Sequence, residues 1–173
     1  MYRIFLCGPR EDRTAAQLLK ALLSRYGTVC YEGVSYGSGE RSFLLEEGEE
    51  WPGQGSGLLL FKKSFREMGK CSASGWIALL ESGFAAGLRA LYGTGIPTAL
   101  YGTSPRDTFS VSSSDFPCGS VSMLRGVTTL SGEFLEPGEI PIYMEHPLCP
   151  EQMVLLCAVL VLCGVPSVQG YRM

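Results

Sequence analysis

The stretch that decides the fold is YRIFLCGP, residues 2–9, at the start of the chain. The continuous apolar run over residues 2–7 is typical of a strand covered on both faces, as in a parallel sheet. Asp12 or Thr14 can cap a helix in which apolar residues recur at helical spacing from Ala15 to Leu23, and Gly27 is placed to end that helix. The chain therefore opens with a central strand, a tight turn at Gly8-Pro9 and a helix.

Strands and helices continue to alternate along the chain. This alternation predicts an α/β fold, a three-layer Rossmann-like or flavodoxin-like sandwich with a mainly parallel sheet, as one domain over residues 1–173. The expected strands cover 28–31, 57–61, 96–101, 108–111 and 121–124. The expected helices cover 74–92 and 151–163. A long loop covers 33–57 with one helical turn at 42–47, a polar linker covers 66–74, and a hairpin or extended excursion covers 133–144.

Composition and charge narrow the class of protein. The net charge is −3, from 14 basic and 17 acidic residues, and no basic stripe could follow the phosphates of a nucleic acid. The first apolar run is too short for a signal peptide, and the run from Met153 to Cys163 is too short to cross a bilayer. We therefore expect no nucleic-acid or membrane partner, and the second run should form a buried core helix.

The cysteines indicate a reducing compartment. Their number is seven, with no C-x-x-C pair, which favours free thiols in a cytoplasmic protein. The one histidine, His146, lies in a segment typical of a loop, and the spacings match no common metal site. No metal and no cofactor are expected.

Glu81 is the acidic residue that most needs an explanation. In a helix over 74–92 it would share the apolar stripe with Ile77, Phe84 and Leu88. A buried carboxylate must be paired, hydrogen-bonded or raised in pKa, and those conditions also suit a catalytic nucleophile or acid. An ion pair with Arg89 or Lys63 is the structural alternative.

The Gly8-Pro9 turn is the second candidate feature. A parallel α/β fold brings ligands to the carboxyl ends of its strands, where this turn and Lys62-Lys63-Ser64 should lie. Neither G-x-G-x-x-G nor the P-loop motif is present, so a tight strand-to-helix connection explains the turn equally well. Trp51 in the long loop is either a stacking platform or a hydrophobic plug.

Two blocks of sequence resemble the nucleoside 2-deoxyribosyltransferase family. The block ESGFAAGL (81–88), running into GIPTALY (95–101), is similar to that family's "E-x-G-[YF]-A … G-x-P" segment, and IFLCGP (4–9) is similar to its first strand and turn. Lys62-Lys63-Ser64 and Gly75 stand where the family carries aspartates. The resemblance covers about residues 2–27 and 55–102.

The resemblance implies a site and a reaction. Glu81 would be the catalytic nucleophile that attacks the anomeric carbon of a nucleoside or nucleotide. The substrate-binding residues would be Gly8, Pro9, Lys62, Lys63, Ser64 and Gly75. The family also forms dimers or larger assemblies, which makes a homo-oligomer an expectation for this chain.

Two functions therefore remain open. One is an N-glycosidase or 2-deoxyribosyltransferase that acts on a nucleoside or nucleotide. The other is a non-catalytic nucleotide-sensing or protein-interaction module on the same fold. A flavin-binding protein is the weaker third reading, because the first turn lacks a Ser/Thr-rich phosphate loop.

Overall fold

The computed structural model describes residues 1–67, 69 and 74–173. The chain divides into two compact units, Met1–Thr98 (unit 1) and Ala99–Met173 (unit 2), and each is described by itself. Cys71 and most of the expected linker over 66–74 lie outside the described residues. The expectation of one domain over 1–173 stays a prediction.

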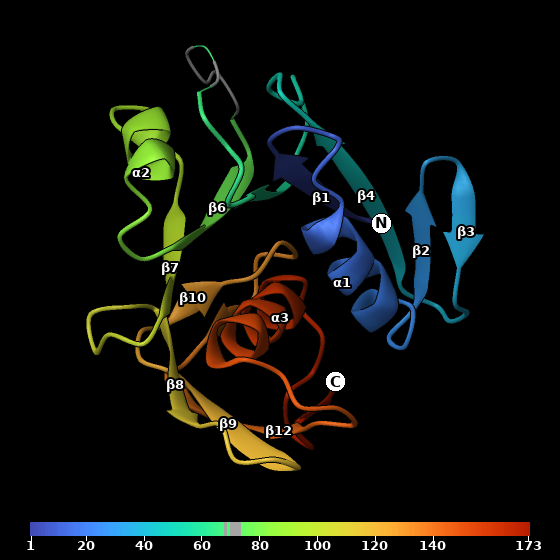
Figure 1. The fold of residues 1–173 in the computed structure, drawn as a ribbon, viewed down its shortest axis with the longest axis vertical. Coiled ribbons are helices and arrows are strands. Elements are labelled where there is room, and N and C mark those ends of the chain that lie inside the picture. Colours follow the sequence, from blue (N-terminus) through green and yellow to red (C-terminus); the bar gives the residue numbers. More distant parts are fainter. Residues whose placement is uncertain (68, 70–73) are drawn as a thin grey trace. The chain divides into compact units, whose positions relative to one another are not determined.

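Unit 1 is an α/β unit built on a mainly parallel sheet (Figure 1). Its elements are β1 (Tyr2–Cys7), α1 (Thr14–Leu23), β2 (Thr28–Tyr31), β3 (Val34–Tyr36), β4 (Ser42–Gly48), β5 (Gly57–Phe61), β6 (Trp76–Glu81) and α2 (Ala85–Leu91). The strand order is β6-β5-β1-β4-β2-β3, and all neighbours run parallel except β2 and β3. β1 is therefore central, as its apolar run predicts.

The two helices of unit 1 cover opposite faces of the sheet. Leu60 pairs with Leu6 and Phe61 with Cys7, so Lys62 continues the Leu6 face and Phe61 lies on the other. Lys62 contacts the segment that leads into α1. In α2, a Cβ on Gly87 would lie 2.4 Å from Leu80 and 3.4 Å from Phe61. The expected α/β fold with a mainly parallel sheet is confirmed, and unit 1 has three layers.

The prediction of a long loop over 33–57 is wrong in part. Residues 34–36 and 42–48 form β3 and β4, and β4 is inserted between β1 and β2. In β4 the buried residues alternate as Phe43, Leu45 and Glu47, which is the period of a strand. The helical turn expected at 42–47 is therefore absent. The prediction failed because one of the inward-facing residues of this strand is a glutamate, so the apolar residues alone do not show the period of a strand.

The prediction of a helix over 74–92 is also wrong for the first half of that range. Residues 76–81 form β6, and only Ala85–Leu91 is helical. Gly75 has φ 87° before the strand and Gly83 has φ 82° after it, so the backbone turns at both ends of the WIALLE run. Glu81 is consequently the last residue of a strand and not part of a helical stripe.

Unit 2 combines a mixed sheet with one apolar helix. Its elements are β7 (Thr98–Gly102, beginning at the boundary), β8 (Phe109–Ser113), β9 (Cys118–Met123), β10 (Val127–Thr128), β11 (Phe134–Leu135), β12 (Gly138–Tyr143), α3 (Pro150–Leu162) and β13 (Tyr171–Arg172). The order β7-β8-β9-β12-β13 is parallel at both ends and antiparallel in the middle. β11 pairs with β10 and β12 pairs with β9, so the 133–144 segment is neither a hairpin nor an extended excursion.

The last helix is buried, as the sequence predicts. α3 starts at Pro150 and packs on β8 and β9 of unit 2. Nine of its residues are buried, in an unbroken run from Leu156 to Leu162 with Met153 and Val154 before it. Across the described residues, no helix has the length and apolar character needed to span a membrane.

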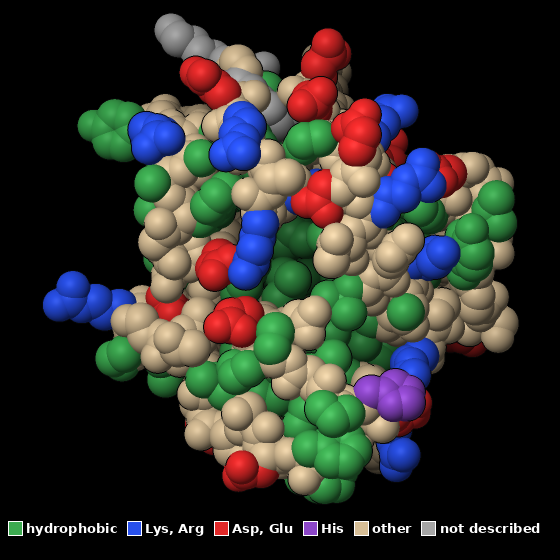
Figure 2. Space-filling view, viewed as in Figure 1, with side chains coloured by type: hydrophobic (Ala, Val, Ile, Leu, Met, Phe, Trp, Pro, Cys, Tyr) green, Lys and Arg blue, Asp and Glu red, His purple; other side chains and the backbone are tan. Residues whose placement is uncertain are grey.

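The charged side chains of unit 1 are interspersed. On the face in Figure 2, Lys and Arg side chains alternate with Asp and Glu side chains over this unit. Arg3 pairs with Glu46 at 2.6 Å and Arg13 with Glu32 at 3.1 Å. Opposite charges therefore compensate one another locally on this part of the surface.

Gly57 tests the packing of the central strands. A Cβ at this position would lie 2.5 Å from the Arg3 carbonyl oxygen and 2.8 Å from Trp76 Cζ3. We expect Gly57→Ala to lower the free energy of unfolding by about 1–3 kcal/mol, because backbone and a buried ring must move. Gly48→Ala is the matched control, since its Cβ would meet only Phe5, at 3.4 Å. Urea denaturation of the two variants checks this, and equal losses would contradict it.

Candidate functional site

The carboxyl edge of the unit 1 sheet brings together most of the predicted site residues. β1, β5 and β6 are neighbours and parallel, so Gly8, Lys62 and Glu81 follow or end strands at the same edge. Pro9, Lys63 and Ser64 lie beside them in sequence. The structure therefore places six of the seven predicted residues at one edge of the sheet, and the exception is Gly75.

Lys62 is fully buried at this edge, and its ammonium group has three acceptors. Nζ donates to the carbonyl oxygens of Pro9 at 2.6 Å and Asp12 at 2.8 Å. It also donates to Glu47 Oε2 at 2.5 Å, in an ion pair whose side chains are 0% and 6% exposed. An ammonium group has three N–H donors, so all of its donor capacity is used inside the protein.

Glu47 completes this buried network. Its second carboxylate oxygen accepts a hydrogen bond from the Tyr31 hydroxyl, and its backbone carbonyl accepts one from Arg10 Nε at 3.2 Å. Burial, together with the hydrogen bond to Glu47, raises the pKa of Tyr31 to about 12. Lys62, Glu47 and Tyr31, which we call the buried triad, thus link β5, β4 and β2.

The buried triad lies at the switch point of the sheet. The chain leaves β1 toward β2 on one side and leaves β5 toward β6 on the other, and ligands of open α/β sheets enter between two such strands. Lys62 spans this gap, and a Cβ on Gly8 (φ 139°) would lie 3.2 Å from the Lys62 side chain. The predicted residues Gly8, Pro9 and Lys62 therefore contact one another.

Asp12 lies in the β1–α1 connection beside the switch point and is bonded to Ser64. The Ser64 hydroxyl donates to Asp12 Oδ2 at 2.5 Å, and the Thr14 backbone N–H donates to Oδ1 at 3.3 Å. The hydrogen bond from Ser64 is the main cause that lowers the pKa of Asp12. Asp12 is thus an anionic group at neutral pH, at the same edge as the predicted site.

Glu81 is more open than Glu47. Its side chain is 31% exposed, and Lys63 Nζ lies 3.7 Å from its Oε2, with the Lys63 side chain 79% exposed. This distance exceeds that of a hydrogen bond, and exposed ion pairs contribute little to stability. Lys63 is therefore one of the two ion-pair partners expected for a structural Glu81, but its ammonium group is too far from the carboxylate for a hydrogen bond.

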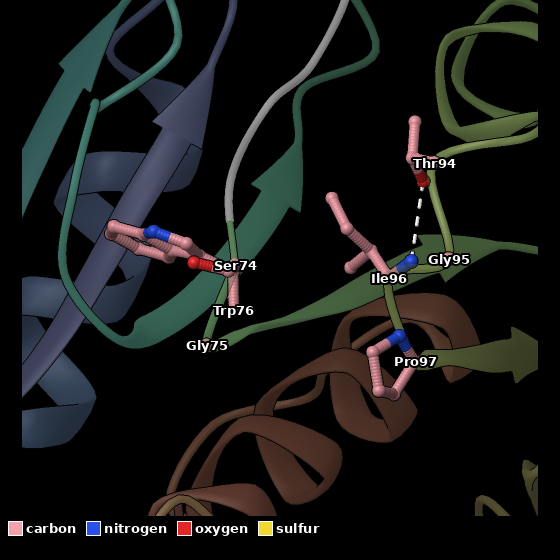
Figure 3. A pocket seen from close by; sticks show the side chains of 7 residues that line it. All are labelled: Ser74, Gly75, Trp76, Thr94, Gly95, Ile96 and Pro97. Carbon is pink, nitrogen blue, oxygen red and sulfur yellow. Dashed lines mark hydrogen bonds between the residues drawn. The ribbon is translucent and has the colours of Figure 1, made fainter.

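Gly75 lies at the opposite edge of the sheet. It precedes β6, whereas Glu81 ends the same strand, so the prediction that Gly75 joins Glu81 in one pocket is wrong. Gly75 instead lines a cavity of about 400 Å³ with Ser74, Trp76 and the Thr94–Pro97 turn. In Figure 3 the Trp76 indole points away from that turn, and its buried Nε1 has no hydrogen-bond partner among the residues that the structure describes.

Trp51 and Asp107 both make contacts that explain them structurally. Trp51 is half-buried, packs edge-on against Phe61 and donates its N–H to the Gly69 carbonyl, which favours the hydrophobic plug. Asp107 is buried in unit 2 and accepts a hydrogen bond from the Ser104 backbone N–H at 2.9 Å. Its local contact within unit 2 is that of a turn residue.

Sequence reasoning missed Glu47 and Tyr31 and assigned Asp12 only to helix capping. Residues 43–47 read FLLEE and do not alternate between apolar and polar types, so no signal in the sequence shows that Glu47 lies on the buried face of a strand. Within the described residues, no group of three or more His, Cys, Asp or Glu side chains could hold a metal ion. No protein-family model matches the sequence, and no curated protein is significantly similar to it.

The buried triad should dominate the stability of unit 1. We expect Lys62→Met to lower the free energy of unfolding by about 3–5 kcal/mol, because Glu47 then keeps a buried charge without its cation. Combining it with Glu47→Leu should recover part of the loss, and Lys63→Met, at an exposed neighbouring position, should change stability by less than about 0.5 kcal/mol. Urea denaturation of the three variants measures these effects, and equal losses for Lys62→Met and Lys63→Met would refute the assignment.

Tyr31 gives this network a pH signature. An unfolded tyrosine ionises near pH 10, whereas native Tyr31 has a pKa of about 12. Its contribution to stability is therefore complete below pH 10 and is lost as the pH rises from 10 to 12. The free energy of unfolding should fall more steeply in that window for the wild type than for Tyr31→Phe. Parallel slopes, or a phenolate signal from Tyr31 near pH 10, would argue against it.

Proposed function

We propose that the carboxyl edge of unit 1 binds a nucleoside or nucleotide, and that Glu81 cleaves or transfers its N-glycosidic bond. The observation that carries this proposal is the contrast between two glutamates at one edge. Glu47 is committed to Lys62 and Tyr31, whereas Glu81 is partly exposed and has only a long ion pair among its described contacts. A carboxylate without a tight structural partner is available for chemistry.

The reaction would proceed by displacement at the sugar. A Glu81 carboxylate oxygen attacks C1′ and forms an ester bond while the C1′–N bond breaks, and its electron pair leaves with the base, which takes a proton from water. Water, or the nitrogen of a second base, then attacks C1′ and releases Glu81 as a carboxylate. Lys63, with its exposed ammonium group, would pair with a phosphate on a nucleotide.

A second function is favoured by the buried triad. Lys62 lies at the switch point with its ammonium group bonded to three acceptors of the protein, which supports a non-catalytic nucleotide-sensing or protein-interaction module in which this lysine serves the fold. Such a module would gain thermal stability from a nucleotide without turning it over. A homo-oligomer and a cytoplasmic location stay predictions for both functions.

Base release from nucleosides separates the two functions. We expect the wild type to release free base from at least one member of a panel of ribonucleosides, deoxyribonucleosides and their monophosphates, measured by chromatography. Glu81→Gln should reduce that rate by at least on the order of 100-fold, because an amide is a poor nucleophile.

The matched control is Glu50→Gln, at an exposed position of the same unit, which should keep the wild-type rate. Base release that is equal in wild type and Glu81→Gln would refute the role of Glu81. Thermal stabilisation by a nucleotide without any base release would support the non-catalytic module instead.

A further inference from the structure

A second carboxylate faces the edge at which Glu81 ends its strand. Asp12 belongs to the β1–α1 connection, and sequence reasoning gave it no role beyond helix capping. Its carboxylate is partly exposed, accepts a hydrogen bond from Ser64 at 2.5 Å and is anionic at neutral pH. A carboxylate has about four acceptor positions, so the donors of Ser64 and Thr14 leave capacity for a ligand.

The Asp12 backbone is held by Lys62, a side chain that is itself fully buried and paired. The Asp12 backbone carbonyl accepts a hydrogen bond from Lys62 Nζ at 2.8 Å, and Lys62 is fully buried and paired with Glu47. The position of the Asp12 backbone is therefore set by the buried triad. A binding group supported in this way needs little reorganisation when a ligand arrives.

The contacts of Asp12 and Glu81 meet on two consecutive residues. Ser64 is bonded to Asp12, and Lys63, one residue earlier, is paired with Glu81. β1 and β6 flank β5 on either side, so the two acids approach the end of β5 from opposite sides. A ligand lying over Lys63-Ser64 would have one carboxylate on each side.

The chemistry of this pair suits a polyol. An anionic carboxylate accepts hydrogen bonds from hydroxyl groups and repels phosphate, and a serine hydroxyl can both donate and accept. We propose that Asp12, together with Ser64, hydrogen-bonds the sugar hydroxyls of the ligand and so determines which sugar the site accepts. This inference rests on the proposed function, in which Glu81 faces C1′ of the same sugar.

Binding of nucleosides with and without sugar hydroxyls tests the inference. Glu81→Gln protein, which cannot turn over its ligand, is titrated calorimetrically with the four ribonucleosides and with their 2′,3′-dideoxy counterparts. We expect at least one ribonucleoside to bind about tenfold or more tightly than its dideoxy counterpart, as hydrogen bonds to a charged group imply. Adding Asp12→Ala should abolish that preference, and adding Ser64→Ala, which leaves Asp12 in place, should weaken it.

Asp115→Ala, an exposed aspartate of unit 2, is the matched control and should keep the preference. A preference that survives both Asp12→Ala and Ser64→Ala would overturn the inference, as would equal binding of the two series or no binding at all. Base release by the wild type combined with an Asp12-independent preference would leave the proposed function standing alone. An Asp12-dependent preference without base release would retain sugar recognition and remove the glycosidic chemistry.

Discussion

The ammonium group of Lys62 is the constraint on which unit 1 depends. A positive charge without exposure to water must find its partners within the fold, and two different segments supply them. The two carbonyl oxygens come from the β1–α1 connection, and the carboxylate comes from β4. The turn at Gly8-Pro9 and the end of β4 are thereby fixed relative to the end of β5.

Glu47 and Glu81 show how the same residue type acquires different properties at one sheet edge. Glu47 lies on the buried face of β4 with a side chain 6% exposed, so its carboxylate is enclosed and needs Lys62 and Tyr31. Glu81 ends a strand just before a turn at Gly83, and its carboxylate remains in contact with solvent. Enclosure makes the first a structural acid, and partial exposure leaves the second available to a ligand.

The elements with a clear apolar period could be predicted from the sequence. β1, α1, β2, β5 and α3 fall where their apolar residues indicate, because burial on two faces or on one stripe leaves a direct trace. β4 and β6 could not be predicted in this way. A buried glutamate interrupts the apolar pattern of β4, and the run WIALLE in β6 fits either a strand or a helix. Only the glycine conformations at 75 and 83 separate these alternatives.

The candidate site was predicted in part, for a related reason. Gly8 and Lys62 could be grouped because both follow apolar runs typical of parallel strands, whereas Glu81 was joined to them only by the family resemblance, since β6 was not expected as a strand. The inward orientation of the Lys62 side chain could not be predicted, because its partner Glu47 belongs to β4, a strand that the sequence pattern does not indicate. Gly75 was misplaced because a strand, unlike a helix, carries its two ends to opposite edges of the sheet.

The positions of the tryptophans determine what their fluorescence reports. Both tryptophans of the chain, Trp51 and Trp76, belong to unit 1. Trp76 is sealed in the core with the Arg3 guanidinium 5.3 Å from its ring centroid, whereas Trp51 is half-buried against Phe61. Indole emission therefore reports on unit 1 alone, from one enclosed and one partly hydrated fluorophore, and unit 2 is spectroscopically silent in that channel.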